Sequence, residues 1–393
     1  MRLNIVNFLD ADWEYDYKRP HLEGLGKYTN LLCIEPPMTL NILLRHPLLF
    51  LDWLKRRRYF RQIGSTLWLY KPLALVPYSI SLRFQIFRKL NKYIMRASIR
   101  NVIKKLWMSD HILMLSHPAQ EYVIGMLNER CICYDLYDEH SESRVTSSKI
   151  RKLVKGEELK ILNKADVIFT SARNLYETKK VINPNTHFVP NAADVKFFMK
   201  SMEADTKIPP DILKIPEPRI GLIGNINDIV DMDLLVYIAE QKPDWSIILI
   251  GNINGSPHFL KSQSFSRCKK LSNIHIMGFR NYETLPSYQK GLDVCLLPYL
   301  INEYTLNVYP NKVHQYLAGG KPVVSTDLPE MRPFVEVVDI TINHDDFLDH
   351  VEKALINDNA IISEKRIKIA IENSVEKRAE LKVLLLNEVL NGK

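Results

Sequence analysis

The residue best placed to bind and neutralise an anion is a lysine in the first turn of a predicted helix. Pro310 and Lys312 open a stretch with helical spacing that ends at Gly319–Gly320, and a strand-like run follows over 321–326. Proline suits the first position of a helix, where its missing N–H has no cost. The first backbone N–H groups of a helix are unpaired, and the helix dipole favours negative charge there. With a lysine beside them, these groups predict a binding site for a diphosphate.

An acidic pair that resembles a metal-binding motif has a simpler explanation. Asp231 and Asp233 flank Met232 at the start of a predicted helix, where Asp231 would serve as the helix cap. The sequence contains no Cys-X-X-Cys pair and no Cys/His spacing suited to zinc. We therefore expect neither a metal nor another cofactor.

The elements that would position these residues form two successive α/β series. In the first half, strand-like apolar runs alternate with segments in which apolar residues recur every three or four positions, which is a helical period. Alternating strands and helices predict a parallel sheet with helices on both faces. The first-half strands are expected at 3–9, 30–36, 111–116, 130–135 and 166–170, and the helices at 86–106, 121–128 and 149–163.

The second half repeats this alternation after a proline-rich segment, 201–218, which we interpret as a linker. We predict two doubly wound, Rossmann-like domains, over 1–200 and 218–360, and a helical tail over 361–393 that can pack back toward the first domain. Ligands of such folds bind beyond the carboxyl ends of the strands, so an enzyme with a central cleft is expected. The second-half strands are expected at 219–223, 245–250, 274–277, 294–297 and 322–325, and the helices at 231–241, 282–290, 311–317, 345–356 and 363–390.

The stretch YPNKVHQYLAGGKPVVST, at 309–326, is the most informative motif. With the segments around it, it resembles the nucleotide-binding domain of GT-B glycosyltransferases of family four, also called group 1, especially bacterial enzymes of cell-surface polysaccharide assembly. Each segment is short, but their order and spacing are those of the family. The matching segments are 219–224, 243–251, 273–278, 282–286, 293–298, 302–305 and 310–326 in the second half, and Trp13, 19–20, 134–139, 165–166, 170–171 and 189–194 in the first.

The resemblance implies a GT-B fold and a retaining transfer, without a metal, from a nucleotide-sugar donor bound to the C-terminal domain. Lys312 would contact the diphosphate, and Gly224 would let the backbone approach it closely. Residues 277–280 would meet the nucleotide base, and 303–305 would face the transferred sugar. The donor-binding positions so implied are Gly224, Asn225, Gly278, Phe279, Arg280, Glu303, Tyr304, Thr305, Asn307, Lys312 and Gln315.

This chain departs from the family's pattern in three places. The family usually has a carboxylate where this chain has Gln315, and often a second one at the position of Asn307. The family also usually has a basic residue after the first glycine of the C-terminal domain, where this chain has 225–228. An amide oxygen can accept a hydrogen bond from a ribose hydroxyl, but without the charge that makes such bonds roughly twice as strong. We therefore expect Gln315 to bind the ribose more weakly than a carboxylate would, and the departures together to lower the affinity for the donor.

Polar residues at the ends of first-half strands are the candidates for catalysis. His117 follows the strand at 111–116, where it could contact the sugar donor or acceptor, or equally be bonded to the backbone. Asp138 and Glu139 follow the next strand and could orient or deprotonate an acceptor hydroxyl, or cap a solvated turn. Arg19 could meet a phosphate-bearing ligand or form a surface ion pair.

The positive charge of the chain is concentrated in one segment. The net charge is +8, and residues 41–110 hold fifteen Lys or Arg against two acids. Within this segment Lys55, Arg56, Arg57 and Arg58 lie among apolar and aromatic residues, a combination suited to an anionic bilayer interface. We predict that these four residues face the membrane, although a soluble basic surface would have the same composition. No motif for reading a nucleic-acid groove or stacking on RNA is present, so nucleic acid is not an expected partner.

The expected location is the cytoplasm, with peripheral attachment to the inner face of the cell membrane. No stretch of uncharged apolar residues reaches the length of a membrane-spanning helix. The N-terminal run turns acidic at Asp10, unlike a signal peptide. The cysteines are odd in number and lie mostly in apolar runs, which indicates buried thiols in a reducing compartment.

Three functions fit these observations. The leading one is transfer of a sugar from a nucleotide-sugar donor to a lipid-linked or membrane-associated glycan acceptor. A GT-B-fold epimerase acting on a nucleotide-sugar is an alternative, but it would have no use for a basic amphipathic region. A degenerate member that binds a sugar nucleotide without turnover is the other, and Gln315 and Asn307 support it.

Overall fold

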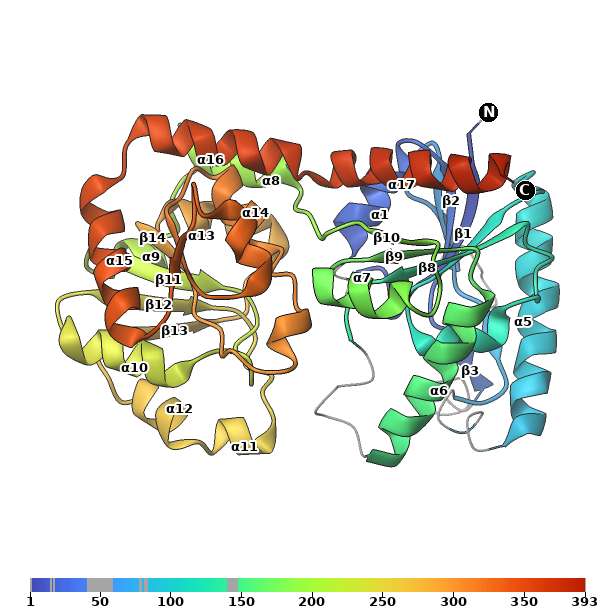
Figure 1. Cartoon of the computed structure of the whole chain (residues 1–393), viewed down its shortest axis with the longest axis horizontal. Helices are drawn as coiled ribbons and strands as arrows, with labels where there is room; N and C mark the ends of the chain where they lie inside the picture. Colours follow the sequence, from blue (N-terminus) through green and yellow to red (C-terminus); the bar gives the residue numbers. More distant parts are fainter. Residues whose placement is uncertain are drawn as a thin grey trace. The chain divides into compact units, whose positions relative to one another are not determined.

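The structure is a computed structural model that describes residues 2–14, 16, 18–40, 59–77, 80, 84–139 and 148–392. The chain divides into two compact units (Figure 1). The first unit contains Met1–Pro190 and Glu376–Lys393, and the second contains Asn191–Val375. The proline-rich segment 201–218, interpreted above as a linker, lies within the second unit.

The first unit is built on an eight-stranded sheet in the order β10-β9-β8-β7-β1-β2-β5-β4. All neighbours are parallel except the edge pair β4 and β5. The middle strands are buried along nearly their whole length, as parallel strands covered on both faces must be. Two short strands, β3 and β6, pair separately. The strands are β1 (Asn4–Phe8), β2 (Asn30–Ile34), β3 (Met38–Thr39), β4 (Phe60–Gln62), β5 (Leu67–Tyr70), β6 (Leu73–Ala74), β7 (Ile112–Leu115), β8 (Cys131–Leu136), β9 (Val167–Thr170) and β10 (Thr186–Phe188).

Helices cover this sheet, and one of them departs from the sequence prediction. A helix was expected over 121–128, but the structure has a short 3-10 helix, η1, that ends at Val123. Gly125 and Asn128 adopt positive φ angles of 72° and 61°, which an α-helix cannot accommodate. The helices of the first unit are α1 (Arg19–Gly26), α5 (Gln85–Lys105), η1 (Pro118–Val123), α6 (Ser148–Lys164), α7 (Arg173–Lys180) and α17 (Val375–Asn391).

The tail, predicted as one helix over 363–390, is two helices. The first, α16 (Ala360–Glu372), belongs to the second unit and ends at Asn373, whose side chain bonds back to the carbonyl of Ile369. The second, α17, is coloured red at the C-terminal end of Figure 1 and packs against the first unit. Its residues Ala379 and Leu386 are buried in the same core as the strands.

The second unit is a six-stranded, fully parallel sheet in the order β13-β12-β11-β14-β15-β16. Numbered within the unit, this order reads 3-2-1-4-5-6, the order of a dinucleotide-binding Rossmann fold. Its strands are β11 (Arg219–Ile223), β12 (Ser246–Ile250), β13 (Ile274–Gly278), β14 (Val294–Leu297), β15 (Val323–Thr326) and β16 (Asp339–Thr341). The main helices are α8 (Val195–Met199), α9 (Pro210–Leu213), α10 (Met232–Gln241), α11 (Pro257–Leu260), α12 (Gln263–Cys268), α13 (Leu285–Lys290), α14 (Lys312–Ala318), α15 (His344–Asn357) and α16.

Candidate active site

The strand order of the second unit locates a binding site. The order reverses between β11 and β14, which makes the gap between these two strands the switch point of the sheet. Ligands of doubly wound sheets bind at the switch point, beyond the carboxyl ends of the strands. Gly224 follows the last residue of β11, and Lys312 is the first residue of α14, the helix that follows β14. The fold therefore brings the glycine and the lysine of the sequence prediction to the same edge of the sheet.

Lys312 lies directly over Gly224. A Cβ added at Gly224 would overlap Cε of Lys312 and stand 2.7 Å from its Nζ. Gly224 also has a φ of +152°, a conformation that residues with a side chain rarely adopt. At the end of the neighbouring strand, a Cβ on Gly251 would overlap the carbonyl oxygen of Gly224. The two glycines thus leave backbone exposed beneath a half-buried ammonium group, which suits a phosphate ligand.

A buried tyrosine that the sequence analysis missed holds α14 in this position. The hydroxyl of Tyr316 accepts the N–H of Ile223 at 2.9 Å and lies 3.3 Å from the carbonyl oxygen of the same residue. Ile223 is the last residue of β11, so the bond joins α14 to the strand end beside Gly224. Gln315 is half-buried one turn after Lys312, and Asn225 is exposed next to Gly224. No sequence signal distinguished Tyr316 from a core residue.

The loop after β13 lies at the same edge of the sheet. Phe279, which follows Gly278, is 60% exposed and offers a flat ring. Arg280 is occupied within the loop: its guanidinium donates to the carbonyls of Met277 and Phe279 at 2.6 and 2.9 Å. It also donates to Asp211 at 2.9 Å and to the hydroxyl of Tyr288 at 2.6 Å. Arg280 thus shapes a pocket of about 320 Å³.

The loop between β14 and α14 contains the residues expected to face the sugar. Thr305 is buried, and its hydroxyl donates to the carbonyl of Leu300 at 2.6 Å, so its side chain supports the loop. Glu303 is exposed, and Tyr304 is half-buried. The side-chain amide of Asn307 donates to the carbonyl of Glu303 at 2.9 Å.

The first unit has its own reversal of strand order, between β1 and β7. Asp10 lies beyond the end of β1, and His117 lies beyond the end of β7. The carboxylate of Asp10 accepts hydrogen bonds from Tyr137 at 2.5 Å, Gln120 at 2.9 Å and Ser116 at 3.5 Å. Its position directly after a buried strand-like run was the signal that the sequence analysis overlooked.

Asp10 and His117 open onto a cavity of about 240 Å³ whose walls are mainly apolar. His117 caps η1, and its Nδ1 accepts the N–H of Ala119 at 3.0 Å. The neutral ring therefore carries its proton on Nε2. Burial lowers the pKa of His117 below its ordinary value, and the nearby charge of Asp10 opposes that shift. Apolar lining comes from Phe8, Ile34, Pro36, Val76, Met95 and Tyr122.

A buried lysine completes this part of the first unit. The Nζ of Lys18 lies 3.5 Å from the ring centre of Tyr137, whose hydroxyl donates to Asp10. Burial lowers the pKa of Lys18, and the charges of Asp10 and Asp135 oppose that shift. The arrangement fixes the Tyr137 ring and thereby the carboxylate of Asp10.

The two acids predicted after β8 have local partners. Glu139 forms an ion pair with Lys179 at 3.0 Å, and Glu158 pairs with the same lysine at 3.0 Å. Burial would lower the pKa of Lys179, but the charges of Glu158 and Glu139 outweigh it and raise the pKa. Asp138 accepts the N–H of Glu139 at 2.9 Å. Glu139 therefore helps to neutralise the buried Lys179, a structural role that the sequence did not indicate.

The remaining predicted residues lie elsewhere. Arg19 begins α1 and pairs with Glu23 at 2.9 Å on the surface. Asp231 accepts the N–H of Leu234 at 2.9 Å, which confirms its expected role as the cap of α10. Among the described residues, no group of three or more potential ligands is arranged to hold a metal ion. The basic run Lys55, Arg56, Arg57 and Arg58 lies outside the described residues.

Comparison with known families decides what the second unit is. Residues 217–357 match a family model described as glycosyl transferases group 1. The second unit is therefore similar to glycosyl transferases group 1 over these residues. The matched residues include both Gly224 and Lys312, so the point where the strand order reverses lies within the region of similarity.

A curated protein shares the sequence over a shorter range. The chain is 31% identical over 216 residues to a Bacillus subtilis protein described as putative teichuronic acid biosynthesis glycosyltransferase TuaH. The match covers 52% of this chain and 52% of that protein, so the chain spans about half the length of the curated relative that it matches.

Solved structures share the fold across the whole chain. Sucrose-phosphate synthase from Thermosynechococcus elongatus has a TM-score of 0.70 at 14% identity and covers 100% of both chains. A glycosyltransferase from Rickettsia africae has a TM-score of 0.68 at 12% identity, also over 100% of both chains. HepE from Anabaena, solved with UDP-glucose, has a TM-score of 0.66 at 12% identity and covers 98% of this chain and 99% of its own. The fold of the chain is GT-B, as the sequence predicted.

No helix in the described part of the chain is both long enough and apolar enough to span a lipid bilayer.

Proposed function

We propose that the chain is a retaining glycosyltransferase that moves a sugar from a nucleotide-sugar donor to a membrane-associated or lipid-linked glycan acceptor in cell-surface polysaccharide assembly. The observation that carries this proposal is the side chain of Lys312 lying over Gly224, at the switch point of a group 1 glycosyltransferase domain. The relative described as a teichuronic acid glycosyltransferase supports the polysaccharide context.

On the donor side, the proposed task of Lys312 is to neutralise the departing diphosphate. Negative charge grows on the diphosphate oxygens as the bond to the sugar breaks, so a fixed ammonium group stabilises the transition state more than the ground state. Gly224 and Asn225 would offer backbone to the phosphates. Gln315 would bond the ribose, and the exposed ring of Phe279, with the pocket shaped by Arg280, would receive the base. No metal is needed for this arrangement.

On the acceptor side, the cavity of the first unit is the proposed binding place. His117 carries a proton on Nε2 that can be donated to a sugar hydroxyl, and Asp10 is a carboxylate already oriented by three donors. Asp138 is the second candidate for handling the acceptor hydroxyl. Glu139 is the third candidate, and its carboxylate is paired with Lys179. Arg19 would serve only an acceptor that carries a phosphate.

The proposed location is the inner face of the cell membrane, where lipid-linked acceptors are found. The basic run Lys55–Arg58 remains part of this proposal on sequence grounds. Attachment would be peripheral, because such runs bind anionic lipid headgroups by charge.

The test is incubation of the full chain with a panel of nucleotide-sugars and a membrane extract. UDP-glucose comes first, because HepE of the same fold was solved with it. Sugar transferred to the extract, with its anomeric configuration retained, supports the proposal. Isomerised free nucleotide-sugar would indicate an epimerase, and binding without product would indicate a degenerate member. Lys312→Ala should abolish transfer, whereas Lys353→Ala, a change of the same kind at an exposed site, should not.

A further inference from the structure

Helix α5 has an unusual charge composition. Its 21 residues, Gln85–Lys105, include seven Lys or Arg and no acid. It is the long helix at the outer edge of the first unit in Figure 1. Like charges three or four residues apart destabilise an isolated helix, so contacts with the rest of the unit must stabilise this one.

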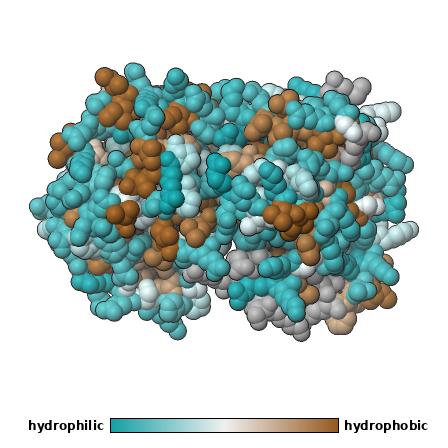
Figure 2. Space-filling model, viewed as in Figure 1, coloured by the Kyte–Doolittle hydropathy of each residue, from teal (hydrophilic) through white to brown (hydrophobic). Residues whose placement is uncertain are grey.

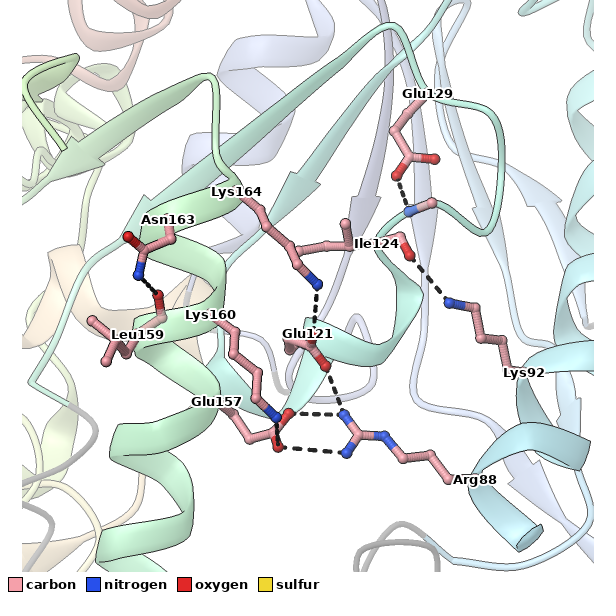
Figure 3. A network of polar contacts seen from close by, with 11 residues as sticks. Arg88, Lys92, Glu121, Ile124, Glu129, Glu157, Leu159, Lys160, Asn163 and Lys164 are labelled. Carbon is pink, nitrogen blue, oxygen red and sulfur yellow. Dashed lines mark hydrogen bonds and ion pairs between the residues drawn. The ribbon is translucent and has the colours of Figure 1, made fainter. Parts of the chain in front are cut away.

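One side of α5 is bound to the body of the first unit. Met95, Ile99 and Ile103, spaced four residues apart, are buried against the sheet. Arg88 donates to Glu121 and Glu157 at 2.8 Å each, and Lys92 donates to the carbonyl of Ile124 at 3.1 Å. Figure 3 shows these two basic side chains reaching from α5 toward η1 and α6. These contacts fix the rotation of the helix about its own axis.

The opposite side of α5 carries apolar and basic residues in one stripe, which we call the outer face of α5. Ile86, Leu90 and Tyr93 are exposed, with Ile86 and Tyr93 at 72% and 73%. Figure 2 shows hydrophobic atoms at the edge of the molecule where the N-terminal end of α5 lies. Residues three or four apart share one side of a helix, so the stripe continues along the helix. Its basic members are Arg96, Arg100 and Lys104.

The basic residues of the outer face, Arg96, Arg100 and Lys104, form no ion pair in the part of the chain that the structure describes. An exposed apolar patch rimmed by charged residues marks an interaction site on a protein surface. Such a patch is stabilised where an apolar phase lies just beneath a layer of negative charge.

We infer that the outer face of α5 docks on the surface of an anionic lipid bilayer. Ile86, Leu90 and Tyr93 would enter the boundary between headgroups and acyl chains, and Arg96, Arg100 and Lys104 would contact the anionic headgroups. The inference rests on the proposed function, because it supplies the surface that would bring the enzyme to a lipid-linked acceptor. It concerns described residues separate from the run Lys55–Arg58.

A bilayer fits the outer face better than another polyanion does. A nucleic acid would neutralise the basic residues but would leave Ile86 and Leu90 in water, because phosphate and sugar offer them no apolar surface. An apolar protein groove would cover the isoleucine and leucine but not the three positive charges. A bilayer interface offers acyl chains to the apolar residues and negative charge to the basic residues at the same time.

The test is co-sedimentation of the full chain with vesicles of phosphatidylcholine mixed with phosphatidylglycerol, and with vesicles of phosphatidylcholine alone. The unmodified chain should sediment with the anionic vesicles only. The triple change Arg96→Gln, Arg100→Gln and Lys104→Gln should weaken binding at least about tenfold. The pair Ile86→Ser and Leu90→Ser should weaken it as well, without changing the net charge.

Matched changes on the second unit are the controls. Lys261→Gln, Lys270→Gln and Lys353→Gln remove the same charge from exposed sites, and Ile356→Ser and Ile361→Ser remove two exposed isoleucines. Both control sets should leave vesicle binding unchanged. A circular dichroism melting curve for each variant confirms that it is folded.

Three outcomes would overturn the inference. These are no binding of the unmodified chain to anionic vesicles, equal loss of binding in control and α5 variants, and binding to single-stranded RNA in place of vesicles. Calorimetry with the donor nucleotide separates this inference from the proposed function. Variants of α5 that no longer bind vesicles but still bind the nucleotide support membrane docking by the outer face of α5. This conclusion does not depend on the result of the transfer assay.

Discussion

The ammonium-bearing side chain of Lys312 lies across the backbone of Gly224, so closely that a methyl group at Gly224 would overlap it. The two residues are 88 positions apart in the sequence and are joined by the strand order of the second sheet and by the bond from Tyr316 to Ile223. The lysine therefore needs the glycine in order to reach its position.

Gly224→Ala should weaken donor binding by about tenfold or more. The new methyl group displaces Lys312, and the backbone at φ +152° becomes strained by about 1–3 kcal/mol. Calorimetric titration with the donor nucleotide measures the effect. Gly125→Ala is the control, because Gly125 also has a positive φ but has open space around it. It should lower the melting temperature without changing nucleotide affinity, and an equal loss of affinity in both variants would argue against the contact.

His117 should titrate below its ordinary pKa of 6.5, because burial disfavours the charged ring. Since the folded pKa is lowered, the contribution of His117 to stability is present above pH 6.5 and declines as the pH falls below it. Asp10→Asn should lower the pKa of His117 further, because a negative charge that favours the imidazolium is removed. Nitrogen NMR of the imidazole ring measures both values. A pKa at or above 6.5, or a rise in the Asp10 variant, would contradict this description.

Glu139→Gln should destabilise the first unit by about 1–3 kcal/mol, because Lys179 loses one of its two charged partners. Turnover at saturating substrate should change by only a few-fold. Removal of a general base would instead lower the rate by about 10²–10⁴-fold. Thermal unfolding and steady-state kinetics on the same preparation separate the two roles. A rate loss of that size with unchanged stability would instead support Glu139 as a catalytic acid-base group.

Leu386→Ala should destabilise the first unit by about 2–5 kcal/mol, because Leu386 of α17 is fully buried in the core of that unit. Leu384→Ala is the matched control: Leu384 is two residues earlier on the same helix and 56% exposed. That change should stay within about 0.5 kcal/mol. Chemical denaturation measures both, and equal effects would mean that α17 does not contribute to the core.

Much of the second unit was predictable from the sequence. Its buried strands are continuous apolar runs bounded by Gly, Pro or Asp, so β11 and β14 were predicted at their observed residues. The first unit was harder, because β4 and β5 are short and lie at the sheet edge, where burial leaves a weak pattern. The break between α16 and α17 was not predicted. Residues 363–390 contain no Gly or Pro, and Ser374 pairs instead with Ala193, far away in the sequence.

The candidate site was predictable where it depends on residue type and unpredictable where it depends on tertiary contacts. Lys312 and Gly224 were predicted from the sequence because a lysine at a helix start and a glycine after a strand are typical of a phosphate site. The structure brings the two residues together. The ion pair of Glu139 with Lys179 and the bonds that orient Asp10 depend on tertiary packing. Those partners come from separate helices and strands, and no local pattern encodes them.

The most direct test of the central claim compares nucleoside diphosphate binding with nucleoside binding. UDP, GDP and dTDP are titrated by calorimetry into the unmodified chain, and the best binder is then compared with its parent nucleoside. The diphosphate should bind the unmodified chain much more tightly than the nucleoside does. In Lys312→Ala that advantage should largely disappear, while nucleoside affinity and melting temperature stay the same. A diphosphate advantage as large in the variant as in the unmodified chain would contradict the assignment of Lys312 to the donor phosphates.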